Sequence, residues 1–303
     1  MDNFNQQFLY AIVIIGLGYA LKRFKVLKEQ DGEGLSRIIF NITLPALIIV
    51  TFNDINIDYS LILLIVIAFF YGLFIAFLGL WVFKKESRKT KGMMGMMIPG
   101  FNIGLFAYPL VEGIWGKDGL KYFGMFDVGN ALIVFGVSYL IGSFYAQDNV
   151  KLGFKEITGK MVKSIPLMTY LLIFLLNLTG YQLPSFFIEV SEIVSLANMP
   201  LALLLLGIYL NFSFEKSYKI LAIKFIAFRY GVGLALGIIL YIILPFEDMF
   251  KYTVLIGLIL PTSVSILPYS VEFDYDRKFV GTVSNLTIIL SFFLLWGIGN
   301  LLL

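Results

Sequence analysis

GMMGMMIPGFNIGLFAYPLVEGIW, residues 92–115, is as apolar as a membrane helix, yet two prolines and five glycines interrupt it. Pro99 and Pro109 each lack a backbone donor and clash with the preceding helical turn. Asn102 adds an amide between them. Backbone without helical hydrogen bonds is tolerated at membrane depth only where protein or a water-filled cavity satisfies its polar groups. We therefore expect a broken helix here, with a binding site beside the break.

The composition is that of a polytopic membrane protein. Of the 303 residues, 59% are hydrophobic and 14% are charged, and the mean hydropathy is +0.88. Soluble domains are about 45–50% apolar and about 25% charged. The apolar residues fall in runs near the length that crosses a bilayer. The net charge of +3 is too small to indicate nucleic acid as a partner.

The chain has neither cysteine nor histidine. Disulfides, thiolate metal sites and a cysteine nucleophile are therefore excluded. Histidine proton relays, His-ligated metals and the Ser-His-Asp triad are excluded as well. No catalytic residues, no metal site and no cofactor are expected. The N-terminal MDNFNQQ contains an acid and no basic residue, so it does not resemble a secretory signal.

Ten hydrophobic spans are expected, and the fourth and ninth contain two prolines each. The spans are residues 5–21, 36–52, 59–83, 93–115, 120–144, 165–178, 185–210, 221–244, 253–271 and 279–302.

The basic residues support this count of spans. All of the 23 Lys and Arg residues except Lys117, Lys121 and Lys251 lie in or beside the connections that follow odd-numbered spans. By the positive-inside rule these connections are cytoplasmic, which places both termini outside the cytoplasmic membrane. A wrong number of spans would scramble the alternation.

The longest polar connection, residues 145–164, divides the chain into halves, residues 1–144 and 165–303. Val150, Phe154, Ile157 and Met161 recur at helical spacing with lysines between them. The pattern fits a short amphipathic helix on the cytoplasmic surface. An ordinary cytoplasmic linker fits it equally well.

The two halves resemble each other. Pro45 and Pro200 are separated by the same number of positions as Asn130 and Asn285, and the two double-proline spans are the fourth of one half and the fourth of the other. Matches in the same order indicate an internal repeat. Because each repeat has an odd number of spans, the second copy is inverted, as in secondary transporters. The predicted fold is all-α and polytopic, with ten transmembrane helices as two inverted five-helix repeats and crossed broken helices 4 and 9.

The ninth span contains Pro261 and Pro268, with three hydroxyl side chains, those of Thr262, Ser263 and Ser265, around the first of them. A half-helix that begins at a break presents unsatisfied N–H groups and a partial positive charge. Two such ends facing one cavity would attract an anion. The freed carbonyls at the opposing ends could hold a cation. The alternative is that the prolines, including Pro99, only kink their helices.

Amide side chains are the next candidates for binding. Asn102, Asn130 and Asn285 could bind a carboxylate or satisfy a broken helix, or could simply join helices within the membrane. Asn41 and Asn198 lie beside Pro45 and Pro200, where we expect them to satisfy kinked backbone.

Asp127 and Arg229 are candidates among the ionisable residues that fall within predicted spans. Asp127 shares a helix face with Asn130, and a carboxylate at membrane depth is a functional candidate, here for proton coupling. The alternative is a hydrated position near the outer interface. Arg229 could meet an anionic substrate, but we favour a position where it snorkels to the cytoplasmic surface with Lys224.

Several short motifs, in this order, resemble the auxin efflux carrier family of bacterial and plant transporters. The motifs are Phe101-Asn102-x-Gly104, Pro109-Leu110, Gly116-x-x-Gly119-Leu120, Asn130, Asn198-Met-Pro200-Leu, Leu206-Gly207, Pro261 through Tyr269 and Ser284-x-x-Thr287.

The resemblance implies a ten-helix fold of two inverted repeats with crossed broken helices, more distantly similar to the bile acid sodium symporter fold. It implies organic anions as substrates: auxin in plants, and small carboxylates such as malonate or malate in bacteria. It also implies that Asn102, Pro109 and Pro261 line the substrate region. The short linker favours the bacterial type.

We therefore expect a secondary carrier that moves a small organic anion by alternating access, not an enzyme. Spans 3, 4, 5, 8, 9 and 10 would form a moving bundle, and spans 1, 2, 6 and 7 a scaffold that could support a homodimer. Substrate binding is expected at Asn102, Pro109, Asn130, Pro261, Ser263, Ser265 and Asn285. Asp127 would suit proton coupling, and Thr262 and Thr287 sodium coupling. The alternative is a non-transporting receptor or sensor with the same fold.

Overall fold

The computed structural model describes residues 2–53, 55, 58–146, 154–211 and 215–302, and these residues are almost entirely helical. Within them the only β-type pairing is one antiparallel bridge, between Phe101 and Thr262. Seven helical segments of the described chain are long and apolar enough to cross a membrane. The protein is therefore an all-α, multi-pass membrane protein.

The first half of the chain contains the helices up to the central connection. They are α1 (Asp2–Arg23), α2 (Asp31–Ile38), the π-helical turn η1 (Ile39–Thr43), α3 (Leu44–Phe52), α4 (Tyr59–Val82), α5 (Arg88–Met97), η2 (Ile103–Ala107), α6 (Tyr108–Leu132), η3 (Ile133–Ser138) and α7 (Tyr139–Tyr145).

The second half begins within that connection. Its helices are α8 (Phe154–Lys163), α9 (Ile165–Thr179), α10 (Ser185–Ser195), α11 (Asn198–Tyr209), the 3-10 turn η4 (Lys216–Tyr218), α12 (Lys219–Ile243), α13 (Asp248–Gly257), α14 (Ile266–Glu272) and α15 (Arg277–Leu302).

Local sequence signals set several of these boundaries. Asp58 precedes α4 and its carboxylate accepts the N–H of Leu61 at 3.0 Å, which satisfies a donor that the first helical turn leaves free. Ser87 caps α5 in the same way. At the other end of α9, Gly180 has φ +68°, a left-handed conformation that stops a helix and favours glycine.

Gly116 divides α6 into two parts. Its φ of +60° and ψ of −144° are not helical, so the chain bends between Trp115 and Lys117, with helix on both sides of the bend. This angle pair is open to glycine and strained for other residues. The bend at Gly116 lies within the continuous apolar segment Ile103–Tyr145, which is 43 residues long.

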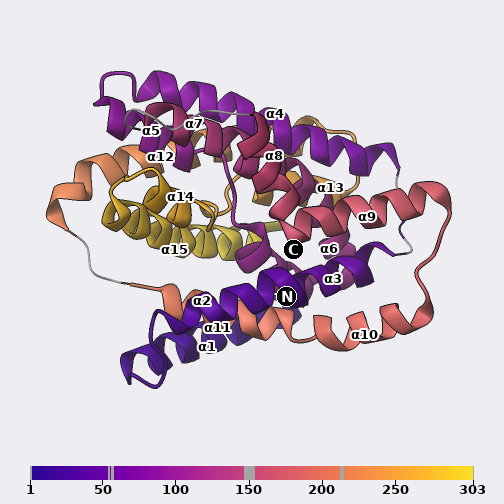
Figure 1. The fold of residues 1–303 in the computed structure, drawn as a ribbon. Coiled ribbons are helices and arrows are strands. Elements are labelled where there is room, and N and C mark those ends of the chain that lie inside the picture. Colours follow the sequence, from indigo (N-terminus) through magenta and orange to yellow (C-terminus); the bar gives the residue numbers. More distant parts are fainter. Residues whose placement is uncertain (1, 54, 56–57, 147–153, 212–214, 303) are drawn as a thin grey trace.

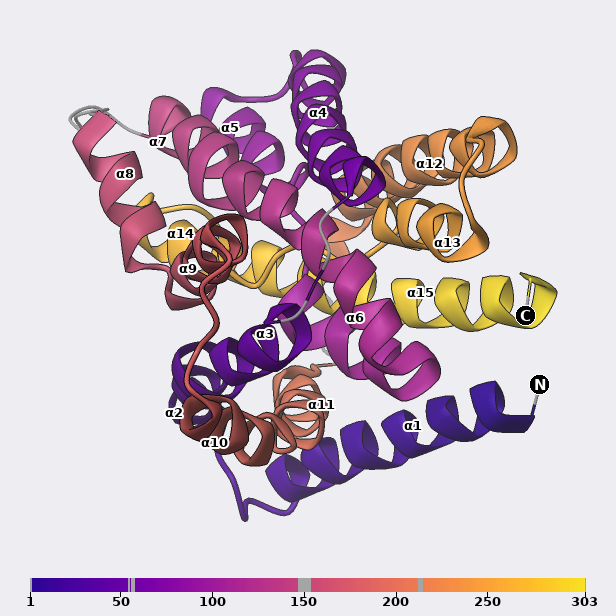
Figure 2. The ribbon, with the colours of Figure 1, turned by 90° about the vertical axis from the view of Figure 1, so that its right-hand side faces the viewer.

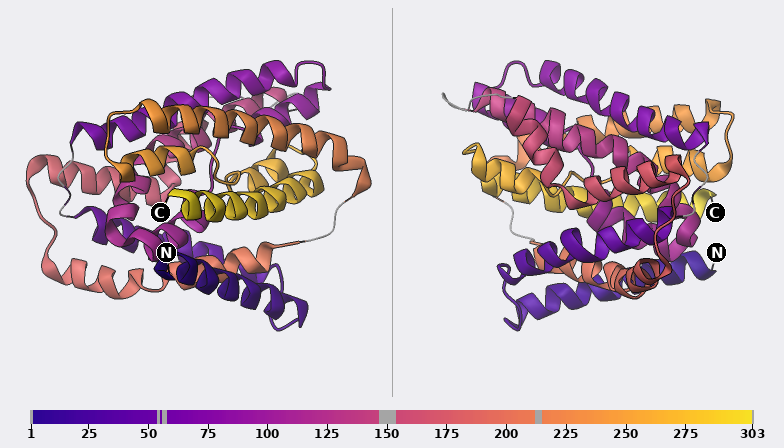
Figure 3. Two further views of the ribbon diagram at one scale, coloured as in Figure 1. Left: turned by 180° about the vertical axis from the view of Figure 1, so that it is seen from behind. Right: turned by 45° about the vertical axis from the view of Figure 1, so that its right-hand side comes forward.

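The helices form two groups with α6 between them (Figures 1 and 2). One group consists of α1, α2, α3, α10 and α11, and the other of α4, α5, α7 and α12 to α15. The same division is visible from behind and from the side (Figure 3). Within the first group α1 lies along α11, where a Cβ on Gly207 would overlap the carbonyl oxygen of Ile15. Glycine therefore permits backbone contact between these two helices.

The central connection contains a helix, α8, where the sequence left a helix and an ordinary linker equally open. Val150, one of its predicted apolar positions, lies outside the described residues. Lys160 of α8 pairs with Glu272 of α14 at 2.8 Å, which links the connection to the second half of the chain.

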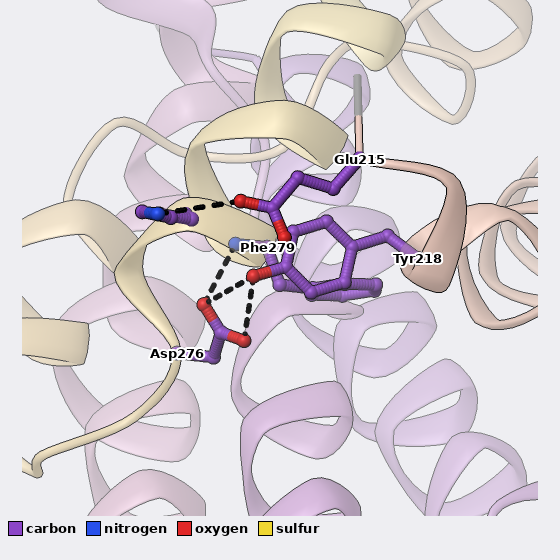
Figure 4. A network of polar contacts seen from close by, with 5 residues as sticks. Glu215, Tyr218, Asp276 and Phe279 are labelled. Carbon is purple, nitrogen blue, oxygen red and sulfur yellow. Dashed lines mark hydrogen bonds and ion pairs between the residues drawn. The ribbon is translucent and has the colours of Figure 1, made fainter. Parts of the chain in front are cut away.

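A polar cluster joins the start of α12 to the start of α15 (Figure 4). The hydroxyl of Tyr218 donates to the carboxylate of Asp276 at 2.9 Å, and the same carboxylate accepts the N–H of Phe279 at 3.0 Å. Lys278 pairs with Glu215 at 3.3 Å. These contacts hold α12 and α15 together at one end of the second group.

Large apolar side chains point outward along several helices. Phe77 of α4, Leu178 of α9, Ile193 of α10 and Ile242 of α12 are each more than 60% exposed. Apolar surface on this scale is unusual for a soluble monomer. It is the surface that lipid chains would cover.

Candidate functional site

The two double-proline segments are broken, and the breaks meet. Helix α5 ends at Met97 and helical backbone begins again with η2 at Ile103. In the other segment α13 ends at Gly257 and α14 begins at Ile266. Between these ends the two backbones pair as a short antiparallel bridge at Phe101 and Thr262, and we call this place the crossing. The N–H of Asn102 donates to the carbonyl of Pro261 at 2.9 Å, and that of Ser263 donates to Gly100 at 3.2 Å. Each break thus satisfies backbone groups of the other.

Asn130 completes the first break. Its side-chain oxygen accepts the N–H of Phe101 at 2.8 Å, and its side-chain nitrogen donates to the carbonyl of the same residue at 3.1 Å. Asn130 is 4% exposed. The amide therefore replaces both helical partners that Phe101 lacks. Of the two predicted roles of this asparagine, the structure shows that it satisfies the backbone of a broken helix. Binding of substrate stays a prediction.

Hydroxyl groups complete the second break. Thr287 accepts the N–H of Thr262 at 3.2 Å, and the two side-chain hydroxyls lie 3.2 Å apart. Thr287 also donates to the carbonyl of Ser284 on its own helix at 2.8 Å. Both threonines, predicted as sodium ligands, thus lie together at the crossing, and their hydroxyls already have protein partners.

The beginnings of the two following half-helices face one cavity. Asn102 accepts the N–H of Leu105 at 3.3 Å at the start of η2. Ser263 accepts the N–H of Ser265 at 3.3 Å just before α14. Residues 102–104 and 263–265 all line a cavity with about 540 Å³ of empty space, including its opening. Helix N-termini carry partial positive charge, so this cavity is favourable for an anion.

Asp127 lines the same cavity, and its carboxylate accepts hydrogen bonds from neighbouring side chains. One carboxylate oxygen accepts the hydroxyl of Tyr108 at 3.0 Å, and the other accepts the side-chain amide of Asn130 at 3.1 Å. Tyr108 in turn bonds to the hydroxyl of Tyr170. Asp127 therefore lies beside the crossing, and Asn130 bonds both to Asp127 and to the backbone of Phe101.

Arg229 lies neither at the surface nor in the cavity. It is 1% exposed, and its guanidinium donates to the carbonyls of Ile98, Gly100, Leu260 and Pro261. The expected snorkelling toward Lys224 is therefore wrong. Lys224 does lie near the surface and pairs with Glu86 at 2.8 Å. Arg229, five residues farther along α12, turns inward because the two breaks place carbonyls without helical partners within reach of its guanidinium.

The remaining predicted residues lie around the crossing or farther away. Pro109 is buried in the first turn of α6, and Pro99 is buried at the first break. Pro268, in α14, is exposed. Asn285 donates to the carbonyl of Gly281 at 3.0 Å and accepts the N–H of Asn211 at 3.4 Å, and it does not line the cavity.

The kink prolines of the first helix group occupy the starts of helices. Pro45 is buried in the first turn of α3 and Pro200 is exposed in the first turn of α11. Asn198 accepts the hydroxyl of Thr43 at 3.0 Å. Its amide thus joins α11 to the turn before α3 rather than bonding to its own helix.

The cavity therefore brings together Asn102, Asp127, Asn130, Ser263 and Ser265, whereas the other predicted substrate residues, Pro109, Pro261 and Asn285, lie outside its lining. It also has walls that sequence reasoning missed: Phe40 and Leu44 from the first helix group, and Ser164 and Tyr170 from α9 and its cap. The available signal was the hydroxyl groups of Ser164, just before the predicted sixth span, and of Tyr170, within it.

The fold and this site define a multi-pass membrane protein of the transport class, and similarity to known proteins agrees. Residues 5–151 match the sequence model of the family described as "Membrane transport protein". An uncharacterized transporter of Methanocaldococcus jannaschii is 27% identical over 302 residues, which cover 95% of this chain and 96% of that one. An uncharacterized transporter of Methanothermobacter thermautotrophicus is 27% identical over 290 residues, 93% of each chain. The chain is therefore similar to membrane transport proteins over nearly its whole length, which agrees with the resemblance of its motifs to the auxin efflux carrier family.

Proposed function

We propose that the protein is a secondary carrier that moves a small carboxylate-bearing organic anion across the cytoplasmic membrane. The observation that carries this proposal is the cavity shared by the N-terminal ends of two half-helices, at Asn102 and Ser263. Backbone N–H groups and helix dipoles at such ends favour an anion. The amide of Asn102 adds a donor, because its side-chain nitrogen is buried and has no hydrogen-bond partner among the described residues.

The proposal includes ten membrane passes. The segment Ile103–Tyr145 would supply the end of pass 4 and the whole of pass 5, separated by the bend at Gly116. The 15-residue apolar helix α9 would be pass 6. Helices α13 and α14, with the break between them, would form pass 9. Short or interrupted passes escape a count of long helices, which would account for the difference between ten passes and the seven long apolar segments.

One contact supports an inverted repeat. Thr43 and Asn198, which bond to each other, are 155 positions apart, the same offset that relates Pro45 to Pro200. Equivalent positions of inverted copies meet where a twofold axis passes between them. The chain termini also lie together (Figure 2), where Asn5 donates to Asn300 at 2.9 Å. Ends on one side are expected for an even number of passes, and the basic residues favour the outer side.

Alternating access would arise from motion between the two helix groups. Phe40 and Leu44 of the first group and Asn102 and Ser263 of the second lie on different walls of the same cavity. Rocking one group against the other would open the cavity first to one side of the membrane and then to the other. The site would stay fixed within the second group.

We further propose that protons rather than sodium drive the carrier, with Asp127 as the group that binds the proton. A carboxylate beside an anion site repels a second negative charge, so its protonation would favour binding of the substrate. The Asn130 amide that bonds to Asp127 also holds Phe101, which would transmit the protonation state to the crossing.

The proposal is tested by uptake into proteoliposomes. Purified protein would be offered labelled mono- and dicarboxylates of two to six carbons, with an inward proton gradient and then without one. We expect saturable uptake of at least one carboxylate, stimulated by the gradient and lost in Asn102→Ala. Asn177→Ala is the matched control, because Asn177 bonds to the carbonyl of Phe52, away from the crossing. Folded protein that takes up none would contradict the proposal, and binding without uptake would indicate a receptor.

A further inference from the structure

Where helices end at the two breaks rather than begin, the polarity is reversed. Helices α5 and α13 end there, at Met97 and Gly257, and the residues that follow present carbonyl oxygens without helical partners. The last carbonyls of a helix carry partial negative charge. The guanidinium of Arg229 lies between two such ends and donates hydrogen bonds to carbonyls of both. The carbonyls are those of Ile98 and Gly100 after the first helix, and of Leu260 and Pro261 after the second.

Arg229 has no acidic partner there within the part of the chain that the structure describes. None of the ion pairs among the described residues includes it, and its Nε has no hydrogen-bond acceptor. A buried charge is costly unless it is compensated. The compensation consists of the carbonyl dipoles and the face of the Phe101 ring, whose centroid lies 4.6 Å from the guanidinium carbon. The positive charge is thus held by the broken helices themselves.

Unwound carbonyls and half-helix C-terminal ends are the ligands that hold a coupling sodium ion in transporters of crossed-helix construction. Here a side chain of the protein occupies the equivalent place. We infer that the guanidinium of Arg229 is a built-in cation, which balances the two C-terminal ends permanently and takes the place of an exchangeable coupling ion.

Two consequences follow for transport, and they rest on the proposed function. The N-terminal ends keep their attraction for an anion in the cavity, because the charge of the opposite ends is already balanced. Sodium has no free carbonyl cluster to occupy at the crossing, so uptake does not depend on it. Arg229 is then a positioning residue, since it contacts the backbone of the breaks and does not line the cavity.

The inference predicts that a variant without the guanidinium acquires a cation site. Arg229→Gln keeps a shorter side-chain hydrogen-bond donor and removes the charge, which leaves room for a small cation, and Arg229→Lys keeps the charge but loses the planar fork that spans several carbonyls. Tyr230→Phe is the matched control. This neighbour on α12 is also buried, and its hydroxyl bonds to Thr287 and Ser291, but the change removes no charge.

The first measurement is thermal unfolding of the purified proteins in detergent, without substrate. Sodium or low concentrations of guanidinium would replace choline at constant ionic strength. We expect sodium or guanidinium to raise the Tm of Arg229→Gln by about 2–4 °C, through binding to the folded state alone. The wild type, Arg229→Lys and Tyr230→Phe should show no such shift. A shift of equal size in all four proteins, or none in Arg229→Gln, would overturn the inference.

If Arg229→Gln does not fold, the folding and the Tm of Arg229→Lys test the inference instead. A built-in cation requires that this variant fold, and that its Tm exceed that of any Arg229→Gln protein recovered in guanidinium. Failure of both to fold, with guanidinium present throughout, would overturn the inference. Uptake is the second readout: wild-type transport should be equal in sodium and in choline, and guanidinium should restore at least part of the uptake of Arg229→Gln. A wild type that transports nothing would refute the proposed function, while the unfolding results would still decide the role of Arg229.

Discussion

Removing the side chain of Asn130 is expected to damage the crossing more than loss of an ordinary membrane hydrogen bond. In Asn130→Ala, the N–H and the carbonyl of Phe101 both lose their partners, at a residue that is 3% exposed. A buried polar group left unsatisfied costs about 1–3 kcal/mol. Two such groups, with some relaxation of the break, give an expected destabilisation of about 2–4 kcal/mol.

The assay is thermal unfolding in detergent, combined with uptake into proteoliposomes. Asn177→Ala serves as the control, since it also loses an amide bond to a backbone carbonyl, that of Phe52 at 2.9 Å, but away from the breaks. A typical side-chain hydrogen bond within a membrane protein is worth about 0.6 kcal/mol, so the control should lose little stability and keep its uptake. Equal losses of Tm in the two variants, together with unchanged uptake by Asn130→Ala, would refute the role given to this asparagine.

Other predictions test the proton site, the packing of the first helix group and a helix cap. Asp127→Asn should make uptake independent of the proton gradient, as measured by transport against pH. Gly207→Ala should lower the stability by about 1–3 kcal/mol, because its Cβ would overlap the carbonyl of Ile15; thermal unfolding measures this. Asp58→Ala should cost about 1 kcal/mol at neutral pH. Because the Ser60 hydroxyl holds the pKa of Asp58 below its usual value, the wild type should lose this advantage only as the pH falls through that lowered pKa.

The breaks at the crossing were predictable because proline acts locally. Pro99 and Pro261 each remove a donor from a helix wherever they stand, and the structure has non-helical backbone beside both. The order of the motifs around them was enough to indicate the family. The double prolines, in the fourth span of each half, also predicted that these two segments correspond, and the segments are joined by the bridge between Phe101 and Thr262.

The partners of Arg229 could not be predicted in this way. The positive-inside rule counts basic residues along the chain and carries no information on their depth, so Arg229 and Lys224 looked equivalent. The carbonyls that bind the guanidinium come from two breaks that meet only in the folded protein. Asn285 shows the same limit, since its offset matches Asn130 but its amide bonds to Gly281 and Asn211.

The central claim, that an anion binds between the two half-helix N-termini, is tested most directly at Ser265. The chain has no cysteine, so Ser265→Cys provides a single thiol in the lining of the cavity. The measurement is the rate of alkylation of this thiol in proteoliposomes, with and without the carboxylate that the same preparation transports. We predict a several-fold slower reaction with the carboxylate present, and no change for Ser185→Cys at the exposed start of α10. An unchanged rate at Ser265→Cys, under conditions where the carboxylate is transported, would place the anion elsewhere and contradict the account.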